Sequence, residues 1–330
     1  MSSRAAMVLE AGSPAEWLER HLGAKYERDR HGAEAGPGAG APERWFTRAD
    51  LVADDARVLR ATFAGLVADD LPAPAAATFV ASYVGGLLAD AVGYCLAGME
   101  AGLVVAATGV RWRRHPDGWF DRIDLAGTRF VVAADHPWAD RDDVDVVADD
   151  RRRLVVTVES LVDAVAPIID ACNGLAKVGR AGLWNEVGDG LGMALVDQEA
   201  LPVREEIVAL LCDAVHAPGA RWKARPTLRI AEASFGPTVV GQKGGCCLAY
   251  TRQRADVEET PADESDLDRA YRQRFPDVPG EPRYCTTCSL RDPADCEARQ
   301  IFWMELQRAT TRAETAGAPT SQALGRPVEA

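Results

Sequence analysis

Most of the cysteines gather in the last quarter of the chain, and their spacing is that of metal ligands. Cys246 and Cys247 are adjacent, and Cys285 and Cys288 form a C-x-x-C pair further along the sequence. Two residues between two cysteines let both thiolates reach one metal ion from a short loop without backbone strain. Together, these thiolates complete the ligand set of a zinc ion, or of a [2Fe–2S] cluster with two thiolates on each iron. The sequence therefore predicts a metal centre in the C-terminal part of the chain.

The spacing alone leaves zinc and iron–sulfur both open. Adjacent cysteines chelate a single zinc ion poorly, since successive side chains of an extended backbone point to opposite faces. No histidine follows His216, and the plant-type ferredoxin spacing C-x4-C-x2-C does not occur. A redox disulfide in the C-x-x-C pair is disfavoured, because such motifs belong to a βαβ context that the sequence lacks.

The string CCLAY at residues 246–250, with CTTCSL downstream, resembles the terminal motif of the FhuF-like ferric-siderophore reductases. In that family a C-C-…-C-x-x-C motif holds a [2Fe–2S] cluster. The resemblance implies that Cys246, Cys247, Cys285 and Cys288 are the cluster ligands. A weaker similarity covers the sequence LWNEV, which looks like a tryptophan-containing helix of the family.

The resemblance also implies a function. It predicts a cytoplasmic iron–sulfur oxidoreductase that reduces Fe(III) in a ferric siderophore to Fe(II) and so releases the iron. Siderophores hold Fe(III) in hard oxygen donors that bind Fe(II) far less well. An external electron donor, such as a ferredoxin or flavin reductase, is the expected partner, since the sequence shows no nucleotide site. The alternative is a non-catalytic binding or redox-sensing protein stabilised by zinc or an Fe–S cluster.

The chain departs from the family pattern in two ways. A long insert, residues 248–284, separates the two cysteine pairs, where the family has a short hairpin. The insert is acidic and then helix-like, so we expect a surface excursion whose closure costs little entropy. The second departure is Cys296, which is either a possible replacement ligand or a nearby free thiol.

Composition limits the possible partners. The chain has 330 residues, of which 47% are hydrophobic and 26% charged, as in globular proteins. Its net charge of −13 argues against nucleic-acid binding and against attachment to an anionic membrane. The first residues lack the pattern of a secretion signal, so we expect a cytoplasmic location with reduced thiols.

Hydrophobic periodicity predicts mostly helices. Residues 13–30 are expected to form an amphipathic helix with Ser13 as N-cap, and a glycine- and proline-rich linker follows at 31–42. Residues 78–98 are long enough to span a membrane, but Asp90 in their middle favours a buried helix, expected from 74 to about 100. Further helices are predicted at 48–69 and across 159–216.

Several short segments have strand character. The candidates are residues 103–112, 119–125, 128–134 and 154–158, and their order suggests an antiparallel meander. The acidic run 135–150 is interpreted as a solvated loop. The predicted fold class is α+β, mainly helical with a small antiparallel sheet and a C-terminal cysteine-rich cluster-binding segment.

These elements suggest a domain order. It comprises an N-terminal helix and flexible linker (1–45), a helical α+β substrate-facing domain (46–240), a cluster-binding segment (241–305) with its insert, and a disordered tail (310–330).

The remaining candidates are weaker. Cys95, Cys172 and Cys212 stand alone on apolar helical faces, where cysteine acts as a small buried hydrophobe. The glycine-rich run at 188–192 resembles a nucleotide loop, but it lacks the third glycine and a preceding strand, so close helix packing explains it better.

Two basic features remain. The stretch at 221–225, continued by Arg229, is either a solvated loop or a docking patch for an anionic siderophore complex or an acidic electron donor. Lys243, close to the predicted ligands, is expected to favour the reduced, more negative state of a cluster.

Overall fold

The computed structural model describes residues 13–18, 20–22, 44–106, 108–125, 127–196, 198, 201, 203–251, 265–276 and 284–315. Its α-helices are α3 (Arg48–Ala68), α4 (Ala73–Ala81), α5 (Leu87–Met99), α6 (Asp150–Asn173), α7 (Arg180–Gly192), α8 (Glu205–Val215), α9 (Asp266–Arg274) and α10 (Pro293–Thr315). Shorter turns are the π-helical η1 (Ser82–Gly86) and the 3-10 turns η2 (Met193–Leu195) and η3 (Ala249–Thr251). The strands are β1 (Arg44–Thr47), β2 (Gly102–Val104), β3 (Arg111–Arg114), β4 (Phe120–Asp124), β5 (Arg129–Ala133), β6 (Val144–Val147), β7 (Thr227–Ala233) and β8 (Gly236–Gln242). The mainly helical α+β prediction is confirmed.

The chain enters the core through a capped helix. The amide of Glu16 donates a hydrogen bond of 3.2 Å to the Ser13 side chain, as expected for an N-cap. Trp17 is fully buried and stacks on His21, with 4.5 Å between ring centroids. The rest of the predicted helix and the linker at 31–42 fall outside the described residues.

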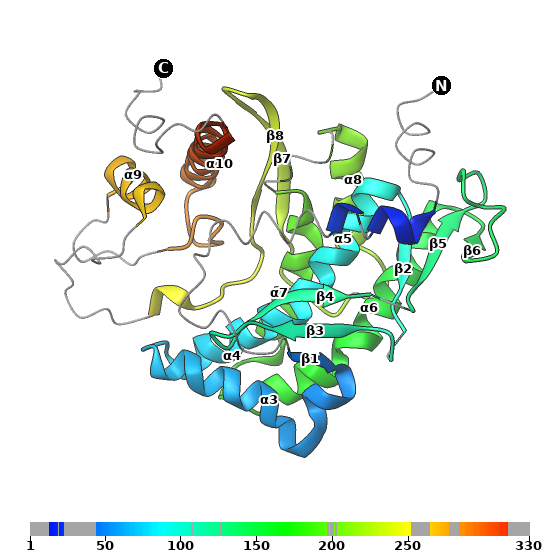
Figure 1. Cartoon of the computed structure of the whole chain (residues 1–330), viewed down its shortest axis with the longest axis horizontal. Coiled ribbons are helices and arrows are strands. Elements are labelled where there is room, and N and C mark those ends of the chain that lie inside the picture. Colours follow the sequence, from blue (N-terminus) through cyan, green and yellow to red (C-terminus); the bar gives the residue numbers. More distant parts are fainter. Residues whose placement is uncertain are drawn as a thin grey trace.

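A long apolar rod runs through the centre of the fold (Figure 1). It consists of α4, η1 and α5, and 72% of its most apolar 18-residue stretch is buried inside the protein. Helix α7 crosses it so closely that a β-carbon on Gly190 would lie 2.3 Å from the carbonyl oxygen of Gly86. Helices α6 and α8 complete the packing. The helix is mostly buried, as predicted, and the glycine run of α7 serves close packing.

The small sheets differ from the predicted meander. Strands β1, β3 and β4 form one antiparallel sheet, whereas β2 pairs antiparallel with β5 and β5 pairs parallel with β6 in another. The predicted strand at 103–112 is therefore two strands in different sheets. Strand β6 lies within the acidic run at 135–150, where its valines pair with β5. That run is therefore only partly a loop.

The predicted strand at 154–158 is wrong, because these residues belong to α6. Asp149 caps this helix by accepting a 2.8 Å hydrogen bond from the amide of Arg152. Leu154, Val158 and Leu161 then repeat at helical spacing and are all buried. A short apolar run fits a strand or a buried helix equally well, and the capped amphipathic continuation decides for the helix.

The hairpin β7–β8 lies between the helical body and α10 (Figure 1). On one side β7 contacts α8, and on the other both strands contact α10. Helix α10 buries Met304 at 1% exposure against this hairpin. The helix continues through residues 310–315, so the prediction of a disordered tail is wrong there; the segment 316–330 is outside the described residues.

Candidate functional site

The two cysteine pairs occupy neighbouring segments although the long insert separates them in sequence. Cys246 and Cys247 follow the end of β8, and Cys285 and Cys288 precede α10. The backbone amide of Lys243 donates a 2.9 Å hydrogen bond to the carbonyl of Thr287. The side chain of Gln242, the last residue of β8, donates to the carbonyls of Cys288 (2.9 Å) and Arg291 (2.8 Å). Strand β8 thus aligns the C-x-x-C loop against the first pair.

The four predicted ligands come within reach of one another. The side chains of Cys247 and Cys285 form a hydrogen bond, Cys285 interacts electrostatically with Cys288, and Cys246 interacts with both Cys247 and Cys288. Cys247 is 9% exposed and Cys288 is 4% exposed, whereas Cys246 and Cys285 are half-buried. Among the residues that the structure describes, no three His, Cys, Asp or Glu side chains are arranged to hold one metal ion. The thiols therefore meet pairwise across the two segments.

Proximity changes the acidity of these thiols. The hydrogen bond with Cys247, together with burial and the nearby sulfurs of Cys247 and Cys288, raises the pKa of Cys285. Burial, and to a lesser extent the neighbouring sulfurs and Glu186, raise the pKa of Cys246. Crowded thiols resist ionisation because their thiolates repel one another, and bound metal cations remove this repulsion. All eight cysteines of the chain are free.

Helix α7 holds the first cysteine segment through two acidic side chains, Asp189 and Glu186. The buried carboxylate of Asp189 accepts hydrogen bonds from the amides of Gly244 (2.8 Å) and Gly245 (3.0 Å). Glu186, at 1% exposure, forms an ion pair of 3.1 Å with the ammonium of Lys243. These contacts fix the backbone that leads into Cys246. A β-carbon on Gly244 would lie 2.3 Å from the amide nitrogen of Arg225, so only glycine fits there.

The charged side chains of Glu186, Asp189 and Lys243, which lie next to the first cysteine segment, shift one another's pKa values. Burial and then Glu186 raise the pKa of Asp189 to about 7, against the opposing effects of Lys243 and the two glycine amides. Burial lowers the pKa of Lys243, but Glu186, Asp189, Cys247 and Cys285 outweigh that effect, so its pKa is raised. Lys243 is therefore a charged group whose field is largely compensated by Glu186. One oxygen of Glu186, Oε1, has no hydrogen-bond partner among the described residues.

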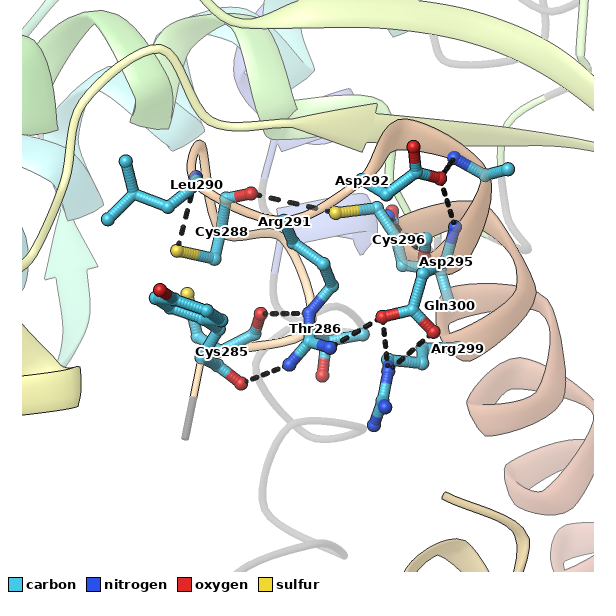
Figure 2. A network of polar contacts seen from close by, with 12 residues as sticks. Cys285, Thr286, Cys288, Leu290, Arg291, Asp292, Asp295, Cys296, Arg299 and Gln300 are labelled. Carbon is cyan, nitrogen blue, oxygen red and sulfur yellow. Dashed lines mark hydrogen bonds and ion pairs between the residues drawn. The ribbon is translucent and has the colours of Figure 1, made fainter. Parts of the chain in front are cut away.

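The C-x-x-C loop has a polar network of its own (Figure 2). The Arg291 guanidinium donates to the carbonyls of Tyr284 (2.6 Å) and Cys285 (3.3 Å) and pairs with Asp295 at 2.5 Å. Asp295 also pairs with Arg299 at 2.9 Å. These three residues repeat at i, i+4 and i+8 from the loop into the start of α10, a spacing that is visible in the sequence. These contacts fix the backbone of the C-x-x-C loop.

Cys296, at the start of α10, lies beside Cys288 and interacts electrostatically with it. It is 2% exposed, and its Sγ points to the carbonyl of Cys288 at 3.6 Å (Figure 2). Burial raises its pKa to about 11. The residue lines a small pocket of about 70 Å³ together with Arg229 and Gln300. Gln300 forms three hydrogen bonds here, two with the backbone of Gly241 and one to the carbonyl of Cys296.

Apolar flanks join the cysteine segments to the body. Leu248 adopts a φ of 60° and packs on the small cluster formed by Leu71, Ala75 and Ala76 of the α3–α4 corner. Tyr250 contacts the ring of Tyr284, with 5.6 Å between centroids, so the residues flanking both cysteine pairs touch.

The other predicted residues have structural roles. Cys95 and Cys172 are fully buried and Cys212 is half-buried, as expected for isolated cysteines; burial raises the pKa of Cys172 to about 12. Arg229 does not extend an open basic patch, because it pairs with Glu297 of α10 at 2.6 Å. The stretch 221–225 lies directly beside Gly244 and Gly245.

The sequence reasoning missed the supporting polar side chains of α7. Asn185, Glu186 and Asp189 lie at i, i+1 and i+4 in a helix whose other buried residues are apolar or glycine. Polar residues on the face of a buried helix are the signal that would have identified them. Comparison of the chain with models of known families and with curated proteins finds no match.

Proposed function

We propose that the chain is a cytoplasmic ferric-siderophore reductase that holds a [2Fe–2S] cluster on Cys246, Cys247, Cys285 and Cys288. The observation that supports it most is the meeting of these thiols from two segments far apart in sequence. Cytoplasmic thiols stay reduced, so four converging thiols there are more naturally metal ligands than disulfide partners.

The donor set fits such a cluster chemically. A [2Fe–2S] cluster takes two thiolates on each iron, so it needs pairs of thiols and not a trio around one ion. Burial raises the pKa of Cys246 and the hydrogen bond with Cys247 raises the pKa of Cys285, and bound iron would lower both. When bound, the cluster would supply one electron at a time to Fe(III) in a siderophore, the substrate.

The protein's own residues have three tasks in this proposal. Asp189 and Gln242 hold the backbone of the two ligand segments in register. Burial of Cys247 and Cys288 limits the access of water and oxygen to the ligands. Cys246 and Cys285 stay half-buried, which leaves one side of the site accessible to a substrate. A ferredoxin or flavin reductase would restore the electron.

Iron content and colour test the cofactor. Anaerobically purified protein is expected to be red-brown, with equal amounts of iron and acid-labile sulfide. Cys285→Ser and Cys288→Ser should each lose the colour, whereas the matched control Cys95→Ser, a buried cysteine remote from the motif, should keep it. Full colour in both motif variants would refute the ligand assignment.

Iron release tests the activity. The reduced protein should release Fe(II) from a ferric siderophore, detected by a ferrous chelator. The alternative is a protein in which zinc or a cluster only staples the C-terminal segment, or acts as a redox sensor. The network of Gln242, Arg291 and Asp295 already fixes that segment, which weakens the need for a metal staple. A stable cluster that transfers no electron to hydroxamate, catecholate or carboxylate complexes would favour the alternative.

A further inference from the structure

Three exposed cations alternate with less exposed residues in the segment before β7. Arg221, Lys223 and Arg225 are exposed, whereas Trp222 between them is 3% exposed. The indole nitrogen of Trp222 donates a 2.8 Å hydrogen bond to the carbonyl of Val215 at the end of α8. The segment is therefore anchored to the core while its charges face solvent. We name Arg221, Lys223 and Arg225 the cationic stripe.

The cationic stripe is electrostatically uncompensated. Within the described part of the chain, no carboxylate forms an ion pair with any of its three residues, although Arg229 just beyond it pairs with Glu297. The Arg221 guanidinium lies 5.4 Å from the centroid of the Trp184 ring, a contact that leaves its charge in place. The whole chain carries a net charge of −13, so this local positive surface runs against its overall charge.

The cationic stripe touches the first cysteine segment. The side-chain oxygen of Asn185 accepts hydrogen bonds from the amides of Lys223 (3.0 Å) and Ala224 (3.1 Å). On its other side, the β-carbon of Asn185 would lie 2.7 Å from a β-carbon added to Gly245. One side chain of α7 thus lies between the stripe and the residue before Cys246. A partner on the stripe would lie next to the half-buried thiols.

We infer that the cationic stripe is the docking surface for an acidic one-electron carrier protein; this inference rests on the proposed function. Exposed charges on alternate residues spread over a surface, which suits the acidic face of a protein. A small anion is held instead by polar groups that converge in a concave site. In the reaction the reduced carrier loses one electron and this protein gains it, and no atom or proton is transferred. The stripe raises the rate of encounter and orients the carrier toward the cysteine segments.

Matched charge variants test the docking surface. Lys223→Gln/Arg225→Gln removes two charges from the stripe, and Arg151→Gln/Arg152→Gln removes two exposed charges from the start of α6. The probe is an acidic plant-type ferredoxin, titrated by calorimetry in its oxidised form and mixed by stopped flow in its reduced form. At low ionic strength we expect the stripe variant to bind about fivefold more weakly and to be reduced about fivefold more slowly. The control should change by less than about twofold, and both differences should vanish at high salt.

The outcomes separate this inference from the proposed function. Equal ferredoxin affinity in the two variants would overturn the docking surface, even if the protein is red and releases Fe(II). Unchanged ferredoxin binding with weakened binding of ferric citrate would overturn it in favour of a small-anion site. The binding titration needs no iron in this protein, so a colourless protein whose affinity depends on the stripe would support the docking surface while refuting the reductase.

Discussion

Asp189→Asn tests whether the buried Asp189 carboxylate, which holds the cysteine segment, destabilises the folded protein when it is ionised. The wild-type side chain is 1% exposed and accepts both the Gly244 and Gly245 amides. Burial and then Glu186 raise its pKa from the ordinary value of 3.8 to about 7. The carboxylate is therefore harder to ionise in the folded protein than in the unfolded chain.

The size of the effect follows from this shift. A rise of about three pKa units corresponds to about 4 kcal/mol, at about 1.36 kcal/mol per unit. Since the folded state holds the proton more tightly, this contribution to stability is fully present below about pH 4 and is lost as the pH rises to about 7. Above about pH 7 both states are ionised and the loss is complete.

Asparagine changes both the ionisation of this side chain and its hydrogen bonds to the two glycine amides. It cannot ionise, so the loss between about pH 4 and 7 disappears. It accepts only one of the two glycine amides and turns its NH₂ group toward the other, and an unpaired buried amide costs about 1–3 kcal/mol. The variant should therefore be less stable than the wild type by about 1–3 kcal/mol at pH 4. At pH 8 the wild type has lost about 4 kcal/mol, which exceeds the cost of the unpaired amide, so the variant should be the more stable protein by about 1–3 kcal/mol.

Urea unfolding of both proteins across pH 4 to 8 measures the two curves. The control is Asp142→Asn, at an exposed carboxylate that forms no ion pair among the described residues. Its curve should run parallel to that of the wild type. If the unfolding free energy of Asp189→Asn ran parallel to that of the wild type, with no crossing near neutral pH, the claim that ionisation of this carboxylate destabilises the fold would be refuted.

Three further predictions concern the same region. Gly244→Ala should lower the free energy of unfolding by about 1–3 kcal/mol in urea titrations, because its β-carbon collides with backbone; Gly179→Ala, which meets nothing within 4 Å, should not. Gln300→Leu should cost about 2–4 kcal/mol by the same assay, because it leaves buried backbone groups of β8 unpaired; an unchanged midpoint would contradict this. Cys296→Ser should keep the iron content of the wild type, and bleaching of the variant would make this residue a ligand. In the iron-free wild type the Cys296 thiol, whose pKa burial raises to about 11, should react with iodoacetamide more slowly than the half-buried Cys246.

Local patterns were enough for the helical part of the fold. The Ser13 cap, the buried helix around residues 74–100 and the helices across 159–216 follow from apolar periodicity, which acts within a few turns. The strand predicted at 154–158 is wrong because a mostly apolar run of five residues fits either element until the capped helix around it is considered. The antiparallel return at 119–125 is confirmed by the pairing of β4 with β3. The hairpin β7–β8 was missed, and the pairing of β5 with β2 and β6 was not predicted, since these strand partners are chosen by contacts distant in the chain.

The sequence by itself determined which residues are the candidate ligands, because thiol chemistry and C-x-x-C spacing are properties of residue type and of neighbours along the chain. Only the tertiary structure decided that the Cys246–Cys247 pair would meet the later pair, and that Cys296 would lie beside Cys288. It also decided what supports them: Asp189 and Gln242 act across long separations in the chain, through the packing of α7 and β8. Such contacts depend on the packing of whole elements, and a local sequence pattern does not encode them.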